Sequence, residues 1–323
     1  MREWRRVTGS VLLGLALVAT SSDPLAQTYS RGQNASPAFE GWEQNADGTF
    51  NLLFGYMNRN WDEVLNIPVG PENNIEPGGP DRGQPTVFLP RRNRFVFRVR
   101  VPKDWGDKEL VWTLTSKGKT EKAFASLRAD YFVDDVVIAS ETGALGAGTS
   151  SPEVRANKRP SVKIDGAATR TATVGQPLTI VAWVTDDGVP RPRGTVGSAV
   201  RRPSPTNASP SLARNPAYNP PSRLTVGKRV GLHLSWFVYR GPAPGDIPDP
   251  PVRFEPAQIK VWEDTRTGAN SPWAPLWTPP PVPTDGRYEV TVLFHAPGTY
   301  TLRARADDGA LFGDEDLTVT VTR

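Results

Sequence analysis

Hydrophobic and polar residues alternate along the last part of the chain. Every second residue of the segment 300–306 is hydrophobic, and the residues between them are threonine or arginine. A period of two is typical of a β-strand that buries one face and exposes the other. An Asp-Asp-Gly turn follows at 307–309, and residues 317–321 repeat the alternation. The pattern predicts an antiparallel hairpin that closes a β-sandwich.

Similar alternation recurs in two blocks of the chain, and no stretch longer than ten residues has a helical period. The strand-like segments are 49–57, 94–101, 110–115 and 120–125 in the first block, and 161–165, 173–185, 230–239, 259–263 and 287–294 in the second. Short alternating segments at regular spacing are the signature of β-sandwiches. We therefore predict an all-β protein with two antiparallel, immunoglobulin-like β-sandwich domains joined by a flexible linker.

The segment 94–101 divides its two faces clearly. Phe95, Phe97, Val99 and Val101 are predicted to point into the core, whereas Val96 shares the other face with Arg94, Arg98 and Arg100. We expect these arginines to be solvated.

Two further expectations concern single features of the chain. His233 alternates with its leucine neighbours and is expected at the surface. The proline- and glycine-rich stretch 71–85 is predicted to be a loop.

Composition supports this reading and places the domain boundaries. The chain has 29 glycines and 33 prolines among 323 residues, together above the usual share of about 12%, which favours turns and short strands over helices. We predict a signal peptide at 1–26, a disordered N-terminus at 27–38, an N-terminal sandwich at 39–140, a linker at 141–159, and a second sandwich at 160–323 with a disordered insertion at 191–229.

The first residues have the pattern of an export signal. Residues 1–6 are positively charged, residues 11–19 are apolar, and small residues follow, so that cleavage is expected after Ser21 or Ala26. The apolar run is shorter than the roughly 20 residues that span a bilayer. We expect an exported mature chain, periplasmic or extracellular, with no transmembrane segment.

Several short motifs of the second block resemble those of one sandwich class. They are Val-Gly-Gln-Pro-Leu at 174–178, Leu-Ser-Trp at 234–236, Pro-Gly-Thr-Tyr at 297–300, and Asp-Asp-Gly at both 186–188 and 307–309. Together they resemble a PKD-type immunoglobulin-like domain over residues 160–323. In that family the central Trp strand usually continues into Asp-Phe-Gly-Asp-Gly, whereas Trp236 is followed here by Phe-Val-Tyr-Arg-Gly. The resemblance implies a spacer or adhesive module and no particular activity. Residues 39–138 resemble no family with a known function.

The resemblance also brings two acidic turns together. Asp186 and Asp187 would end one strand, and Asp307 and Asp308 another that runs the same way, so that all four would lie at one end of the sandwich. Converging carboxylates are the ligands that Ca²⁺ prefers. Calcium is the one cofactor that this pattern suggests, and the alternative is that Asp-Asp-Gly only makes turns.

Two loops are candidates for ligand contacts. Trp273 and Trp277 stand four residues apart in a proline-rich stretch, 271–284, where they could offer flat faces to sugar rings or instead cap the sandwich. The segment 191–229 has eight basic residues, seven prolines and no acidic residue. Its arginines could pair with the acidic turns or bind an anionic glycan or membrane surface, and the alternative is a plain disordered insertion.

Composition argues against several functional classes. The chain has no cysteine and only two histidines, and the net charge of +4 is far from the dense positive charge of nucleic-acid binders. Nothing in the sequence brings carboxylates such as Glu43, Glu63 or the pair Asp134 and Asp135 to the spacing of a glycosidase. We predict no catalytic residues.

The sequence therefore predicts a non-catalytic structural or interaction protein of the bacterial envelope, whose partner is an envelope protein or a glycan. A carbohydrate-binding protein that uses the Trp-rich loop is the first alternative, and a hydrolase with carboxylate chemistry is the second.

Overall fold

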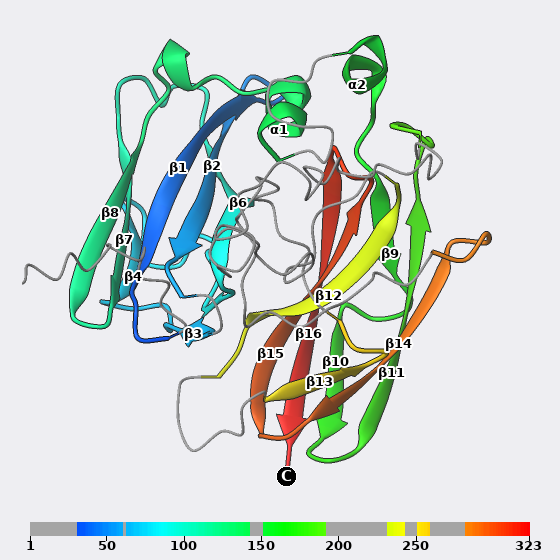
Figure 1. The fold of residues 1–323 in the computed structure, drawn as a ribbon. Helices are drawn as coiled ribbons and strands as arrows, with labels where there is room; N and C mark the ends of the chain where they lie inside the picture. The colour runs from blue at the N-terminus through cyan, green and yellow to red at the C-terminus, as the bar shows by residue number, and fades with distance from the viewer. Residues whose placement is uncertain (1–30, 61–62, 143–150, 192–230, 243–250, 259–281) are drawn as a thin grey trace, which may run out of the picture.

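The computed structural model describes residues 31–60, 63–142, 151–191, 231–242, 251–258 and 282–323. Strands dominate these residues and form several antiparallel sheets, so that the predicted all-β class is confirmed. Figure 1 shows the larger sheets as layers set side by side, from β7 and β8 at one side to β11 and β14 at the other.

The N-terminal block consists of two three-stranded sheets and a short strand pair. The first sheet has the order β1 (Ala35–Gln44), β2 (Phe50–Asn58), β6 (Arg91–Val101); the second has β4 (Asn73–Glu76), β7 (Leu110–Ser116), β8 (Lys119–Ala125); the pair is β3 (Leu65–Asn66) with β5 (Val87–Phe88). Two antiparallel hairpins are present, β1 with β2 and β7 with β8. The first described strand begins at Ala35, inside the stretch that we expected to be disordered, because the first residues of β1 pair with the end of β2.

An aromatic cluster fills the space between the two three-stranded sheets. The Trp112 ring lies edge-on to Phe97 and Phe54, with centroids 5.0 and 5.9 Å away, and its indole N–H donates to the Asn73 side chain at 2.9 Å. The amide of Asn73 donates in turn to the carbonyl oxygens of Ile67 and Pro85. The stretch 71–85 is therefore not only a loop, since Asn73 fixes β4 against the core.

The C-terminal block is a sandwich of two four-stranded sheets. One has the order β10 (Thr169–Thr173), β16 (Phe312–Thr322), β15 (Gly298–Asp307), β12 (His233–Arg240); the other has β13 (Val252–Glu255), β14 (Arg287–Phe294), β11 (Pro177–Thr185), β9 (Ser161–Ile164). The closing hairpin of β15 and β16 is confirmed over its whole length. The hydroxyl of buried Tyr300 donates to the carbonyl of Ala296 at 2.9 Å, as in the tyrosine corner of immunoglobulin-like sandwiches. The predicted strand 259–263 lies outside the described residues.

A bulge in β6 reverses one predicted side chain. Phe54 pairs with Phe97, and two residues later Tyr56 pairs with Asn93, so β6 carries two extra residues opposite Gly55. Phe95 has a positive φ of 48° within this bulge and packs into a separate hydrophobic cluster with Leu53. Val96 points into the main core in its place. The predicted face was wrong for both residues because a bulge shifts the period of two, although Phe95 is buried as expected.

The arginines of β6 are paired with carboxylates. The expectation of solvation was wrong for Arg94 and Arg98, which are half-buried, whereas Arg100 is exposed as expected. Arg98 donates to Glu43 at 2.8 Å, Arg100 pairs with Asp47, and Arg94 pairs with Glu141. Strand β1, which lies on the other side of β2 in this sheet, the turn after it and the helix α1 (Asp135–Thr142) supply these acids, so ion pairs line the outer face of β6.

The predicted linker also packs against the two blocks where it is described. The short helix α2 (Pro152–Ala156) buries Val154 against Ile138 and Ala139 of α1, and this cluster extends to Phe312 in the C-terminal block. Residues 151–159 are therefore not a free linker, because α2 seals one end of the contact between the blocks. No helix within the described ranges has both the length and the apolar character needed to cross a membrane.

A ladder of buried ion pairs joins the two blocks. Arg303 and Arg305 on β15 lie opposite Asp316 and Asp314 on β16, and both arginines are buried. Each guanidinium donates two hydrogen bonds of 2.7 to 2.8 Å to its aspartate. Arg303 also donates to the carbonyl of Val96 on β6, at 2.7 Å. The face of β15 that the alternation assigned to solvent is thus covered by the N-terminal block.

Aromatic rings of the C-terminal block complete this ladder. The guanidinium carbon of Arg303 lies 3.5 Å from the Tyr239 ring centroid, and that of Arg305 lies 3.8 Å from the Phe312 centroid. Burial opposes the charge on Arg303, but the surrounding Tyr239, Asp316 and Asp314 outweigh it and raise the pKa of its guanidinium. For Tyr239 the effect of burial has the opposite sign, and it raises the pKa of the phenol to about 12.

The end of β12 is fastened to the N-terminal block by further hydrogen bonds. Arg240 donates to both oxygens of Asp81 at 2.8 and 3.0 Å and to the carbonyl of Gln84 at 2.8 Å. The Tyr239 hydroxyl donates to the carbonyl of Gly83 at 2.5 Å. Tyr239 belongs to the same core cluster as Trp112. The two blocks therefore share hydrophobic core as well as ion pairs.

Replacing Arg303 by methionine should destabilise the protein strongly, because Asp316 loses its cation and the carbonyl of Val96 loses its donor. We expect a loss of about 3 kcal/mol in the free energy of unfolding, the lower end for a buried pair, because Asp316 is partly exposed. Urea denaturation of the wild type and Arg303→Met measures it. Arg287→Met is the matched control, since Arg287 and Glu289 form an exposed pair on β14, for which the loss should stay below about 1 kcal/mol. Equal losses in the two variants would contradict the structural role of the ladder.

Candidate functional site

The two acidic turns lie close to the segment that joins the blocks. The Asp187 carboxylate accepts a hydrogen bond from the backbone N–H of Lys158 at 3.1 Å. The Asp308 carboxylate accepts one from the side-chain amide of the neighbouring Asn157 at 3.0 Å. Asp187 follows β11 and Asp308 follows β15, so these two strand ends are bridged by adjacent residues.

Each of the four aspartates accepts a hydrogen bond from a backbone amide of its own turn. Gly188 donates to Asp186 and Val189 to Asp187, each at 2.9 Å, and Gly309 donates to Asp307 at 2.7 Å; Asp308 accepts from Ala310 at 2.6 Å and from Leu311 at 2.7 Å. These are the contacts that shape Asp-Asp-Gly turns. Within the described ranges, no three acidic, histidine or cysteine side chains are grouped as metal ligands would be. A calcium site at these aspartates stays a prediction.

Burial changes the acidity of two of these carboxyls. Desolvation raises the pKa of Asp308 to about 6, although hydrogen bonds from Leu311, Asn157 and Ala310 favour its ionised form. Desolvation also raises the pKa of Asp186. The side-chain oxygen of Asn157 is buried and accepts no hydrogen bond from the described part of the chain. Asn157 could therefore present either its amide or its oxygen to residue 308.

His233 is buried, and the expectation of a surface position was wrong. Only 5% of its surface is exposed, because β12 has the sandwich core on one face and the N-terminal block on the other. Its Nδ1 lies 3.1 Å from the carbonyl of Gly231, and its buried Nε2 has no partner among the described residues. The histidine pairs in register with Asp307 of β15.

Two of the predicted ligand contacts cannot be placed. Trp273 and Trp277 lie outside the described residues, and so does the segment 192–230 with most of the basic residues of the insertion. A sugar platform at the two tryptophans stays a prediction.

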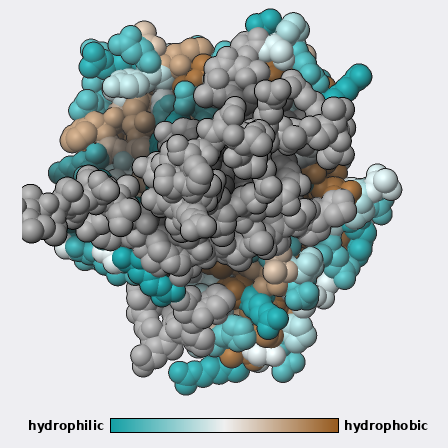
Figure 2. Space-filling view, in the orientation of Figure 1, coloured by the Kyte–Doolittle hydropathy of each residue, from teal (hydrophilic) through white to brown (hydrophobic). Residues whose placement is uncertain are grey.

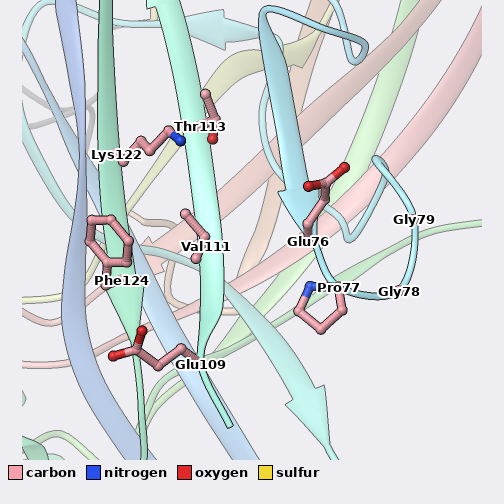
Figure 3. Close-up of a pocket in the computed structure, with 9 residues that line it drawn as sticks. All are labelled: Glu76, Pro77, Gly78, Gly79, Glu109, Val111, Thr113, Lys122 and Phe124. Carbon is pink, nitrogen blue, oxygen red and sulfur yellow. The ribbon is translucent and has the colours of Figure 1, made fainter.

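A groove crosses the outer face of the sheet β4-β7-β8. Its volume is about 570 Å³, and its lining includes Phe124, Val111 and Pro77 together with the charged residues Glu76, Glu109 and Lys122. Figure 3 shows Phe124 and Lys122 on one strand, Val111 and Thr113 on the next, and Glu76 beyond them. The strand register explains this order, since Phe124 pairs with Val111 and Val111 pairs with Glu76.

The groove combines an exposed aromatic ring with charged groups that have no partner in the described part of the chain. Phe124 is 56% exposed, and among the described residues no hydrogen bond or ion pair engages the side chains of Glu76, Glu109 or Lys122. Elsewhere on the same block, most carboxylates are paired, for example Glu40 with Arg92 and Glu63 with Lys117. The free groups of the groove are therefore available to a ligand.

The sequence contains one sign of this groove, the position of Phe124, which the alternation of hydrophobic and polar residues does not explain. In the strand 119–125 the inward positions are Ala123 and Ala125, while Phe124 falls on the polar face beside Lys122. A single exposed aromatic residue is common on protein surfaces, so Phe124 becomes informative only together with the unpaired charges beside it. The groove residues of β4 had no such sign, because β4 was predicted to be loop.

Comparisons with known proteins leave the chain without a family. No protein-family model matches it, and no curated protein matches it in sequence. Among solved structures, domains 4 and 5 of the S-layer protein SbsC share 10% identity over 90% of this chain and 98% of that one, with a TM-score of 0.22. Fibronectin(III)-like modules of CbhA from Clostridium thermocellum share 8% identity over 90% and 94%, with a TM-score of 0.21. The adhesin InvE of Yersinia pseudotuberculosis shares 10% over 90% and 60%, with a TM-score of 0.21. Likenesses this distant carry no conclusion about ligand or role.

The structure gives Asp308 a role in pH-dependent stability. Its folded pKa of about 6 lies above the usual aspartate value of about 3.9, so the folded state binds the proton more tightly. The protonated carboxyl of Asp308 therefore stabilises the folded state. This contribution is fully present below the unfolded pKa and is lost as pH rises through the folded pKa.

We expect Asp308→Asn to remove most of the loss of stability between about pH 4 and pH 6, because the amide stays neutral and Asn157 can rotate to accept from it. Urea unfolding at pH 4.5 and pH 7 checks this. Asp186→Asn is the control for the second raised carboxyl, and a pH dependence that disappears only in that variant would contradict the assignment to Asp308.

Proposed function

We propose that the protein is a non-catalytic interaction module that is exported and works in the bacterial envelope. Its two sandwich blocks form one unit that presents the groove of the sheet β4-β7-β8 to a ligand. The observation that carries this proposal is the free state of the groove's charged groups beside an exposed aromatic ring. The predicted signal peptide supports export, and the motifs of residues 160–323 support a PKD type for the C-terminal sandwich.

The ladder of ion pairs supports a structural role, in which the two blocks move as one unit. Arg303 reaches from the C-terminal block to Val96 in the N-terminal block, and the shared core includes Tyr239. A contact that buries charged and aromatic groups in this way opposes independent movement of the blocks. A rigid unit holds the groove of the N-terminal block in a fixed direction relative to the C-terminal block.

An envelope protein is the first candidate ligand of this groove. A sugar is the second, and it is favoured by the ring of Phe124, which lies among hydrogen-bonding groups. The carboxylates of Glu76 and Glu109 and the ammonium of Lys122 can bond hydroxyl groups around a ring that stacks on the aromatic face. A hydrolase is less well supported, because Figure 3 shows the two carboxylates pointing away from each other. Retaining and inverting glycosidases place theirs on either side of the scissile bond.

Thermal unfolding with soluble ligands tests the groove. We expect at least one probe among cellohexaose, chitohexaose and maltohexaose to raise the midpoint by several degrees at a concentration of about 100 times its dissociation constant, since selective binding adds about 2.7 kcal/mol to native stability. Phe124→Ser should abolish the rise.

The control for this test is Phe132→Ser, which removes an equally exposed ring from a different surface of the same block. It should leave the rise unchanged. A rise that survives Phe124→Ser would move the sugar site elsewhere, with Trp273 and Trp277 as the next residues to replace. The absence of any rise would argue against the sugar ligand and favour a protein partner.

A further inference from the structure

A second exposed surface stands out on the N-terminal block, at the end that faces the helices. Three of the six exposed large hydrophobic residues in the described part of the chain, Tyr131, Phe132 and Val137, fall within seven residues. Phe132 and the neighbouring carboxylates of Glu43, Asp134 and Asp135 line a groove of about 490 Å³. We call residues 130–137 the apolar–acidic patch. In Figure 2 hydrophobic and hydrophilic surface lie next to each other along the upper edge of this block.

The apolar–acidic patch is held in place by the sheet beneath it. The Phe132 ring lies edge-on to Trp42 at 5.1 Å, and the Tyr131 ring lies edge-on to Phe39 at 5.3 Å. The backbone N–H of Val133 donates to the carbonyl of Trp42 at 2.9 Å. The exposed rings are therefore ordered before any partner arrives, and a ligand would lose little entropy from this side.

The charges of the patch are incompletely balanced. Arg159 pairs with Asp135 and lies 3.8 Å from Glu43, which also accepts from Arg98. Asp130 and Asp134 are exposed and have no cation beside them among the described residues, although Asp134 accepts the N–H of Val137 at the start of α1. A partner that fits this surface carries positive charge next to apolar groups.

The chain itself contains such a partner. Residues 192–230 include seven arginines and lysines and no aspartate or glutamate, with seven prolines and Tyr218 among them. The residues on either side of this segment are anchored close to the patch. The N–H of Arg191 donates to Glu153 of α2 at 2.9 Å, and the N–H of Gly231 donates to the carbonyl of Asp308 at 2.7 Å.

These anchors place both ends beside the helices. Helix α2 packs on α1 through Val154, and α1 begins within the patch. Asp308 is bonded to Asn157, two residues before the Arg159 that pairs with Asp135. A segment tethered at both ends has an effective concentration in the millimolar range at nearby surfaces, so even weak contacts are occupied.

We propose that the apolar–acidic patch at residues 130–137 is the docking surface for the basic segment 192–230 of the same chain. Arginines of the segment pair with Asp130 and Asp134, and its prolines and tyrosine contact the rings of Tyr131 and Phe132. The groove of Figure 3 fits the segment less well, because Lys122 stands within it. The acidic turns fit less well too, since Asp307 and Asp308 are buried and both carboxylate oxygens of Asp187 accept backbone amides.

Limited trypsin digestion of the full chain tests the docking. Cleavage after Arg193, Arg214 and Arg223 is followed by mass spectrometry, and the rate reports the undocked fraction. We expect the double variant Asp130→Lys, Phe132→Ser to be cleaved about fivefold faster than the wild type. We also expect 1 M NaCl to speed up cleavage of the wild type, after the effect of salt on trypsin itself has been corrected with a reporter peptide.

Phe124→Ser is the matched control, since it removes an exposed ring from the other groove. Its cleavage rate should equal that of the wild type. Equal rates in the wild type and the double variant would overturn the proposal, and so would faster cleavage in Phe124→Ser.

Variants of the segment 192–230 test the same contact and leave the apolar–acidic patch itself unchanged, so misfolding of the patch cannot explain their result. In the protein with Arg201, Arg202, Arg214 and Arg223 replaced by glutamine, we expect amide hydrogen exchange at residues 131–137 to become several-fold faster, with exchange in β7 unchanged as an internal reference. Unchanged exchange at 131–137 would overturn the proposal. Protection that varies with protein concentration would also overturn it, because the segment would then come from a second copy of the chain.

Discussion

The structure depends on two guanidinium groups that stay charged where water is excluded. Arg303 and Arg305 each face an aspartate directly across the strand pair β15 and β16, and each lies over an aromatic ring. Arginine can fill such positions because its planar fork bonds both carboxylate oxygens while its flat face packs on a ring. With these charges satisfied, the outer face of one sandwich can be buried against a second. A pair of lysines would satisfy the charge but neither the forked bonds nor the stacking.

The alternation of hydrophobic and polar residues was enough to predict the class of fold and most of the strands. It predicted less well which faces of the strands are buried. Arg303, Arg305 and His233 were assigned to solvent because they alternate with core residues, yet a second layer buries them. A period of two shows that the two faces of a strand differ, and it does not show that the polar one meets water. The bulge at Phe95 was hidden for another reason, since the extra residues of β6 leave the local alternation looking regular.

The candidate site was harder to predict than the fold, because it depends on which charges are left unpaired. Glu43 is paired with Arg98, 55 residues away, and Asp81 with Arg240, 159 residues away. Glu76 and Glu109 look no different from them in the sequence. Only the arrangement of strands separates the carboxylates that hold the protein together from those that face a groove. The acidic turns show the converse, because a pattern that suggests a metal site is also a pattern that closes a turn.

The position of β12 has a consequence for how the chain folds during synthesis. Phe237 and Tyr239 complete the hydrophobic cluster around Trp112, although the other members of that cluster all come from the first 125 residues. The first sandwich emerging from the ribosome therefore lacks part of its interior until the central strand of the second has been made. Part of its hydrophobic surface stays uncovered until then, so we expect the N-terminal half made alone to be less stable than the same half within the full chain.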